Sequence, residues 1–146
     1  MRAGVSFSLV TYEYAHTVRN KGLYAAKALG VSYSRVLKTL IVSVDAKPRC
    51  LVVPSNQRVS IDRVMSALGG TTAEIMSPTE AERVTGYRIG GISPIGLNEQ
   101  IQTLIEANIM PGKKVFVNAG TRGLLICIRA EDLIRFLGAR TLHIVT

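Results

Sequence analysis

The segment Val36–Val44, VLKTLIVSV, constrains the fold more strongly than any other part of this 146-residue chain. Branched apolar residues dominate it, as is typical of a β-strand. The DAKP sequence that follows is a turn signal, and CLVVP at residues 50–54 supplies a second strand of suitable composition. The sequence therefore predicts a β-hairpin across residues 36–54.

Signals for helices and further strands alternate along the rest of the chain. Ser60 is a suitable N-cap for a helix closed by Gly69, and SPTE from Ser77 predicts a second helix that ends at Gly86. Further helices are expected at 22–30 and 130–138, further strands at 5–12, 113–120, 123–129 and 141–145, and residues 100–106 fit either element. This order predicts a mixed α/β (α+β) fold, a curved mixed sheet or partial barrel flanked by short helices, in one domain over residues 1–146.

Composition narrows the class of protein. No apolar run approaches the roughly 18 residues of a membrane span, and the N-terminus is a poor signal peptide, so we expect a cytoplasmic protein without membrane contact. Eighteen Lys and Arg against ten Asp and Glu give a net charge of +8, which favours a polyanionic partner such as nucleic acid. Cys50 and Cys127 lie in apolar contexts and are expected to be buried free thiols. We expect no metal and no cofactor.

Lys38 interrupts the apolar strand at 36–44. Alternation places its side chain on the same face as Val36 and Leu40, whereas Leu37, Thr39 and Ile41 face the other way. A lysine at this position is either an edge-strand charge that reaches water or a cation at the mouth of a pocket that binds phosphate or carboxylate.

Two glycine motifs are the other candidate functional segments. GGISPIG, residues 90–96, holds no acid, histidine or cysteine, so any chemistry there must come from its backbone. VNAGTRGLLI, residues 117–126, places Arg122 between Gly120 and Gly123. A connecting loop and a hairpin turn are the simpler explanations, and Asn118 and Arg122 fit a turn or a binding site equally well.

Together, VLKTLIV, GYRIGGISPIG and VNAGTRGLLI resemble, in this order, the motifs of the YbaK and prolyl-tRNA synthetase editing-domain family. The members of this family are aminoacyl-tRNA deacylases, which remove wrongly attached amino acids from tRNA. The resemblance spans residues 36–126. It implies a barrel-like mixed sheet flanked by helices, with the aminoacyl end of tRNA between the lysine strand and the glycine loop.

The resemblance also implies roles for individual residues. Lys38 would contact phosphate or ribose at the terminal adenosine, and Gly90 and Gly91 would present backbone to the aminoacyl carbonyl. The expected substrate-binding residues are Tyr12, Thr39, Ser93, Pro94, Gly96, Asn118, Gly120 and Arg122. The family has no dedicated side-chain nucleophile, so water or groups of the substrate itself would act, and the chain offers no convincing Ser-His-Asp set. His16 is the one alternative base.

Some residues depart from the family pattern. Asn118 stands where serine is frequent, Thr121 where a basic residue is common, and Lys21 where an aromatic residue often lines the pocket. The expected substrate is Cys-tRNA(Pro) or another small amino acid on tRNA, and the expected partners are tRNA and a prolyl-tRNA synthetase. The alternatives are a non-catalytic module that binds tRNA or a synthetase, and a small-molecule hydrolase or binding protein.

Overall fold

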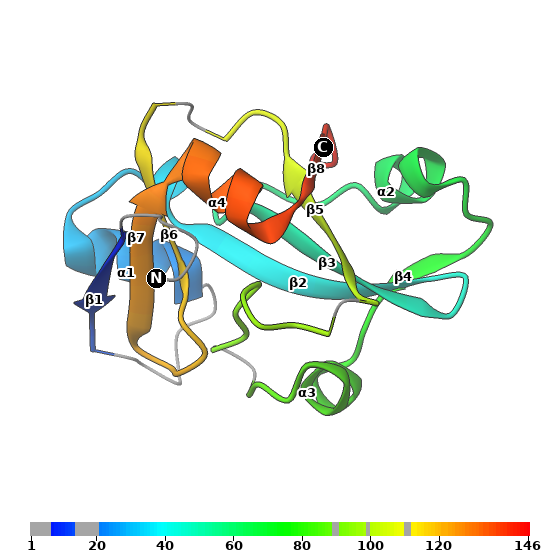
Figure 1. Ribbon diagram of the computed structural model, residues 1–146, viewed down its shortest axis with the longest axis horizontal. Helices are drawn as coiled ribbons and strands as arrows, with labels where there is room; N and C mark the ends of the chain where they lie inside the picture. The colour runs from blue at the N-terminus through cyan, green and yellow to red at the C-terminus, as the bar shows by residue number, and fades with distance from the viewer. Residues whose placement is uncertain (1–6, 14–20, 89–90, 99, 110–111) are drawn as a thin grey trace.

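The computed structural model describes residues 7–13, 21–88, 91–98, 100–109 and 112–146, the side chains of residues 21–23 excepted. Its strands form two open sheets with short helices around them (Figure 1). A three-stranded sheet has the order β1-β7-β6, and a five-stranded sheet has the order β4-β2-β3-β5-β8. The expected mixed α/β fold is therefore confirmed. No helix among these residues is long and apolar enough to span a bilayer.

Antiparallel and parallel pairings occur in the same sheet. β2 pairs antiparallel with β3 and β4, whereas β3 pairs parallel with β5, and β5 pairs parallel with β8. The strand bounds are Phe7–Thr11 (β1), Leu37–Val44 (β2), Lys47–Pro54 (β3), Ala73–Ile75 (β4), Gln102–Glu106 (β5), Lys114–Asn118 (β6), Leu124–Arg129 (β7) and Arg140–Leu142 (β8).

The helices begin and end at the residues that the sequence indicates. Ser60 accepts a hydrogen bond from the Arg63 amide at the start of α2, and Ser77 accepts one from the Glu80 amide at the start of α3. Left-handed glycines close both helices. The helix bounds are Lys21–Leu29 (α1), Ile61–Leu68 (α2), Pro78–Thr85 (α3) and Ala130–Leu137 (α4), with a 3-10 turn at Tyr33–Arg35 (η1).

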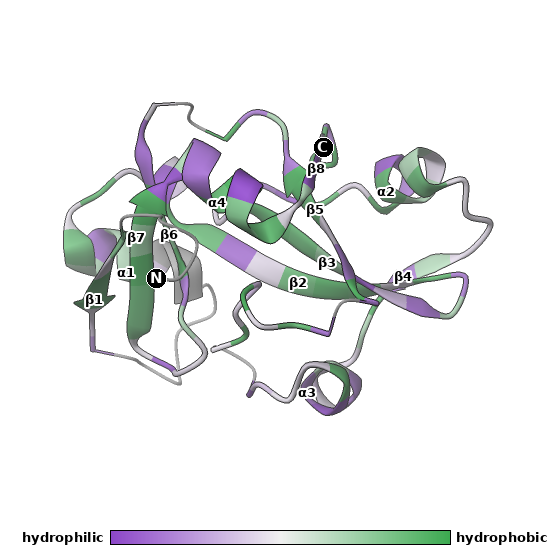
Figure 2. Cartoon of the chain, in the orientation of Figure 1, coloured by the Kyte–Doolittle hydropathy of each residue, from purple (hydrophilic) through white to green (hydrophobic). Residues whose placement is uncertain are grey.

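Strand β2 joins the two sheets and is covered on both faces. Leu37 and Ile41 pack into one apolar cluster together with β6, β7 and α4, whereas Val42 and Val44 pack into a second cluster under α2. A bridge between Val36 and β6 connects the five-stranded sheet to the three-stranded one. Apolar colour covers much of β2 in Figure 2, interrupted by a hydrophilic band.

The sequence left two parts of this architecture unresolved. Residues 100–106 fitted a helix or a strand, and the structure assigns Gln102–Glu106 to strand β5. The short strand β4 and the turn η1 were not predicted, because neither has a periodic pattern long enough to recognise. β8 covers only Arg140–Leu142, although Val145 makes a further bridge to Val59.

A buried carboxylate attaches the C-terminal segment to β5. Glu106 has no exposed surface, and its two oxygens accept hydrogen bonds from the backbone amides of Ile144, Val145 and Asn108. His143 Nδ1 lies 3.2 Å from the same carboxylate. Burial raises the pKa of Glu106, but these hydrogen bonds together outweigh it and hold the pKa below the ordinary value of 4.5.

Replacement of Glu106 by glutamine should lower the free energy of unfolding at pH 7 by about 1–3 kcal/mol, because charged acceptors make the stronger bonds. A lowered folded-state pKa means that the ionised carboxylate stabilises the fold above pH 4.5 and that this contribution is lost as the pH falls through the folded value. Urea unfolding from pH 7 to pH 3 should therefore show a shallower acid-side loss in Glu106→Gln than in the parent.

The matched control is Glu74→Gln, a substitution at an exposed position of β4. Equal stability of Glu106→Gln and the parent at pH 7 would contradict this role of the buried carboxylate.

Candidate functional site

The described part of the first glycine loop, residues 91–96, is folded into the core. Gly91, Ile92, Ser93 and Pro94 are buried, and Ile92 belongs to the cluster formed with Leu37. The Ser93 hydroxyl accepts a hydrogen bond from the Ile95 amide at 3.1 Å. The Gly91 amide donates to the Arg88 carbonyl at 2.9 Å, so in this conformation it is not available to a ligand.

The second glycine motif lies directly against the first. A Cβ atom on Gly91 would come within 3.0 Å of the Arg122 backbone nitrogen and 3.2 Å of the Thr121 carbonyl carbon. Both contacts are with backbone, which cannot rotate away as a side chain can. The absence of a side chain at Gly91 therefore brings the loop and the turn at 119–123 together.

Tyr87 connects the same two segments and was not among the predicted site residues. Its hydroxyl donates to the Ile95 carbonyl at 2.7 Å, and its ring lies 2.8 Å from the position that a Cβ on Gly120 would take. Gly120 also has a φ of +97°, which other residues rarely adopt. The sequence signal that could have identified Tyr87 is its place as an aromatic residue directly after Gly86, which closes α3.

Tyr12 approaches the turn from the other side. Its amide donates to the Gly123 carbonyl at 3.0 Å, and its ring centre lies 6.3 Å from that of Tyr24 on α1. It packs against a third apolar cluster that includes Val36 and Phe116. The structure thus brings Tyr12, Gly91, Gly120 and Arg122 to the end of the three-stranded sheet where β6 turns into β7.

The position of Lys38 follows from the bridge between Val36 and Phe116, which forms the seam between the two sheets. Val36 and Phe116 form a parallel bridge and share the cluster of Tyr12. Because side chains alternate, Lys38 and Asn118, each two residues further along, lie on that same side of β2 and β6. Asn118 leads into the turn that contacts Gly91, so the lysine strand and the two glycine motifs adjoin through β6.

The electrostatic environment of Lys38 is unfavourable for a positive charge. Its ammonium forms no hydrogen bond or ion pair with the described residues, and its side chain is half-buried. Burial lowers the pKa of Lys38 below its ordinary value, and the positive charge of Arg58 lowers it further. Such a lysine is suited to an anionic ligand, which would supply the missing negative charge.

Thr39 faces the opposite side of β2, toward the cluster that contains Ile92. Its Oγ1 is buried and has no hydrogen-bond partner among the described residues. Lys38 and Thr39 therefore do not point into one cavity from the same face. A buried hydroxyl without a partner costs free energy, so a polar ligand group that reached Thr39 would supply the missing hydrogen bond.

A hollow of about 410 Å³ lies on the other side of the first glycine loop. Pro94 and Gly96 line it together with residues 136–138 at the end of α4. The loop therefore has one side toward this hollow, through Pro94 and Gly96, and one side packed against the turn at 119–123, through Gly91.

The described residues offer few reactive side chains. Cys50 is fully buried, and burial raises the pKa of its thiol to about 12, although a hydrogen bond with Thr103 acts in the opposite direction. Cys127 is partly buried, and both thiols are free. No group of three His, Cys, Asp or Glu side chains that could hold a metal occurs in the described ranges. Gly90 and His16 lie outside the described residues.

Comparison with known proteins identifies the family. The model of the aminoacyl-tRNA editing domain matches residues 23–136, so the chain belongs to this family. This span contains both glycine motifs and the strand of Lys38.

Two relatives indicate the branches of the family to which the chain is similar. A protein of Enterococcus faecalis with the provisional name Cys-tRNA(Pro)/Cys-tRNA(Cys) deacylase EbsC is 30% identical over 83% of this chain and 74% of its own length. A proline–tRNA ligase of Streptococcus suis is 26% identical over 67% of this chain, which corresponds to 16% of the ligase. The similarity to the ligase is thus confined to a domain-sized part of that enzyme.

Solved structures share the fold. One, described as a hypothetical protein, superimposes with a TM-score of 0.86 at 25% identity and covers 99% of this chain and 95% of its own. Another, described provisionally as a trans-editing enzyme for prolyl tRNA synthetase, has a TM-score of 0.84 at 20% identity, with coverage of 96% and 87%.

Replacement of Gly91 by alanine should destabilise the protein by about 1–3 kcal/mol, the usual cost of forcing an extra carbon into a packed site. The backbone of Thr121 and Arg122 would have to move to admit this carbon. Thermal unfolding of the variant and the parent measures the effect. An unchanged melting temperature would show that the loop and the turn are not in close contact.

Proposed function

We propose that this protein is a trans-editing deacylase, which hydrolyses the ester bond between a wrongly attached amino acid and tRNA. The observation that carries the proposal is Lys38, a half-buried cation without a carboxylate partner among the described residues, in an editing-domain fold whose β6 links the lysine strand to the second glycine motif. Membership of the family supports the reaction class, and the name of the Enterococcus faecalis relative supports the substrate class.

In the proposed complex, Lys38 binds phosphate or ribose of the terminal adenosine. Asn118, on the same side of the seam, lies near the amino-acid moiety, and Tyr12 closes the pocket from β1. Thr39 offers its hydroxyl from the opposite face of β2. Gly91 acts by allowing the loop to contact the turn at 119–123.

In this proposal, Pro94 and Gly96 form the substrate-facing part of the loop, and Ser93 supports it through its hydrogen bond with the Ile95 amide. Gly120 and Arg122 hold the turn in position beside them.

The reaction needs no nucleophilic side chain. Water adds to the aminoacyl carbonyl, the carbonyl carbon–ribose oxygen bond breaks, and the ribose oxygen takes a proton, which releases the amino acid and the tRNA. The free ribose hydroxyl, or the thiol of a cysteinyl substrate, would assist from within the substrate. A positioned cation and backbone dipoles stabilise the developing negative charge.

Cys-tRNA(Pro) is the first proposed substrate. Incubation with a panel of aminoacyl-tRNAs should release cysteine from tRNA(Pro) faster than alanine or proline. Release of no amino acid above background, with tRNA still bound, would contradict the catalytic proposal and favour a non-catalytic tRNA-binding module. The departures at Lys21, Asn118 and Thr121 make this comparison informative.

Replacement of Lys38 by methionine should separate activity from stability. Because the pKa of Lys38 is lower in the folded protein than its ordinary value of 10.5, the charged form costs stability at neutral pH, and this cost fades only as the pH rises toward 10.5. Lys38→Met removes the cation that binds the substrate in this proposal, so it should reduce deacylation at least 100-fold. Its melting temperature should be unchanged or raised by about 2–4 °C, the shift that 1 kcal/mol gives in a domain of this size.

The control is Lys113→Met, at an exposed position before β6. A Lys38→Met protein that keeps its activity, or one that loses stability and activity together, would contradict the assignment of Lys38 to the site.

A further inference from the structure

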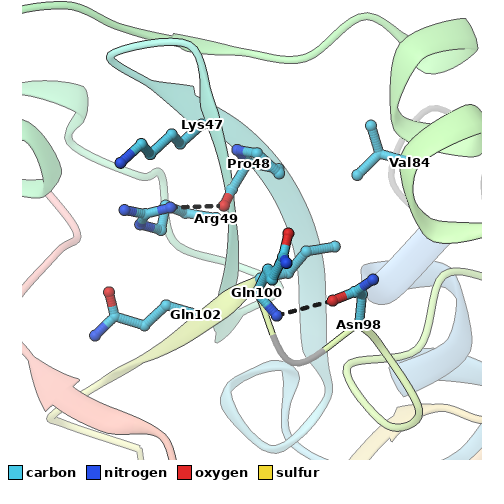
Figure 3. Close-up of a pocket in the computed structure, with 8 residues that line it drawn as sticks. Lys47, Pro48, Arg49, Val84, Asn98, Gln100 and Gln102 are labelled. Atoms are coloured by element: carbon cyan, nitrogen blue, oxygen red, sulfur yellow. Dashed lines mark hydrogen bonds between the residues drawn. The ribbon is translucent and has the colours of Figure 1, made fainter.

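A second hollow, of about 680 Å³, opens at the end of the five-stranded sheet where β3 and β5 begin (Figure 3). Lys47 and Arg49 extend from β3 in the same direction, and Gln102 extends beside them from β5. Arg49 and Gln102 are partners in the parallel register of these strands. Asn98 and Gln100 form the opposite rim, where the Gln100 amide donates to the Asn98 side chain at 2.9 Å.

The described residues that line this hollow carry positive charge and no negative charge. Neither Lys47 nor Arg49 forms an ion pair among the described residues, and none of the described lining residues is acidic. Other basic residues are neutralised locally, as in the pairs Arg129–Glu131 and Arg135–Asp132. Among the described residues, the Arg49 side chain donates only to the neighbouring Pro48 carbonyl, at 3.0 Å, and its buried Nε has no partner. A guanidinium in this state has donors left for an anion.

The hollow is connected to the candidate site. It shares Asn98, Ile101 and Gln102 with the smaller hollow that Pro94 and Gly96 line. Val53 pairs with Lys38, and Arg49 and Lys47 lie four and six residues before Val53 on β3. At the rise of a strand, this corresponds to about 13–20 Å between Lys38 and the basic residues. A ligand that reaches both would have to be a chain several nucleotides long.

We propose that this hollow binds phosphate groups of the tRNA acceptor region, several nucleotides away from the aminoacylated end. Lys47 and Arg49 bind the phosphates, and the side-chain amides of Gln100 and Gln102 bind neighbouring phosphate or ribose oxygens. The residues that line both hollows, Asn98, Ile101 and Gln102, then connect this contact to the glycine loop. This inference rests on the proposed function in one respect, because that function is the reason for choosing tRNA as the ligand.

The test compares two double variants that remove the same charge. Lys47→Gln with Arg49→Gln empties the hollow of cations, whereas Lys113→Gln with Lys114→Gln removes two exposed lysines at the start of β6. Fluorescence anisotropy with an acceptor-stem minihelix that ends in CCA and carries no amino acid measures binding without any turnover. We expect at least tenfold weaker binding for the first variant and less than threefold for the second.

The salt dependence of binding gives an independent reading. The slope of log K against log salt should be shallower by about 1–2 for the Lys47/Arg49 variant, which is the change expected when one or two phosphate contacts are lost. Equal weakening by both double variants would overturn the proposal, because it would mean that only the net charge matters. Lys47→Glu alone, at an exposed position, gives the same test in case Arg49 is needed for folding.

Turnover separates this inference from the proposed function. If the protein is a deacylase, the Lys47/Arg49 variant should lose about tenfold in kcat/KM on an aminoacyl-minihelix and keep its rate on an aminoacyl-adenosine, which lacks the preceding phosphates. An equal loss on both substrates would overturn the phosphate site. A parent protein that binds the minihelix through Lys47 and Arg49 but deacylates nothing would contradict the proposed function and leave this site supported.

Discussion

Burial of β2 on both faces is the constraint on which the rest of the structure depends. Leu37 and Ile41 fill one cluster, Val42 and Val44 fill another, and Val36 joins the strand to β6. A shift of one residue in the register would exchange the two faces and turn Lys38 toward the cluster that Leu37 and Ile41 fill. The same packing that holds the sheets together therefore also fixes where Lys38 and Thr39 point.

Because of this constraint, the candidate-site residues Lys38 and Thr39 lower the stability of the fold. An apolar residue at position 38 would suit the surrounding strand better than a half-buried ammonium near Arg58. The Thr39 hydroxyl also destabilises the fold, since it is buried without a hydrogen bond among the described residues. Sites that bind charged ligands commonly carry such a cost, because the ligand completes interactions that the protein leaves open.

Local signals predicted the elements, whereas contacts between distant segments could not be predicted. The hairpin of β2 and β3 and the helix limits at Ser60, Gly69, Ser77 and Gly86 follow from a few adjacent residues. The parallel pairing of β3 with β5 and the contact of Gly91 with Arg122 depend on segments far apart in the sequence. β5 itself was ambiguous because buried residues on both of its faces remove the alternation that marks a strand.

The contacts of Glu106 with residues 143–145 have a consequence for synthesis of the chain. Ile144 and Val145 are buried in the cluster under α2, and their amides complete the hydrogen bonds of the Glu106 carboxylate. These two residues follow Glu106 by 38 and 39 positions, so they are synthesised well after it. The earlier strands can pair during translation, but the second cluster closes only once residues 144 and 145 have left the ribosome. Until then, the Glu106 carboxylate needs water as its partner, and β5 lacks its pairing with β8.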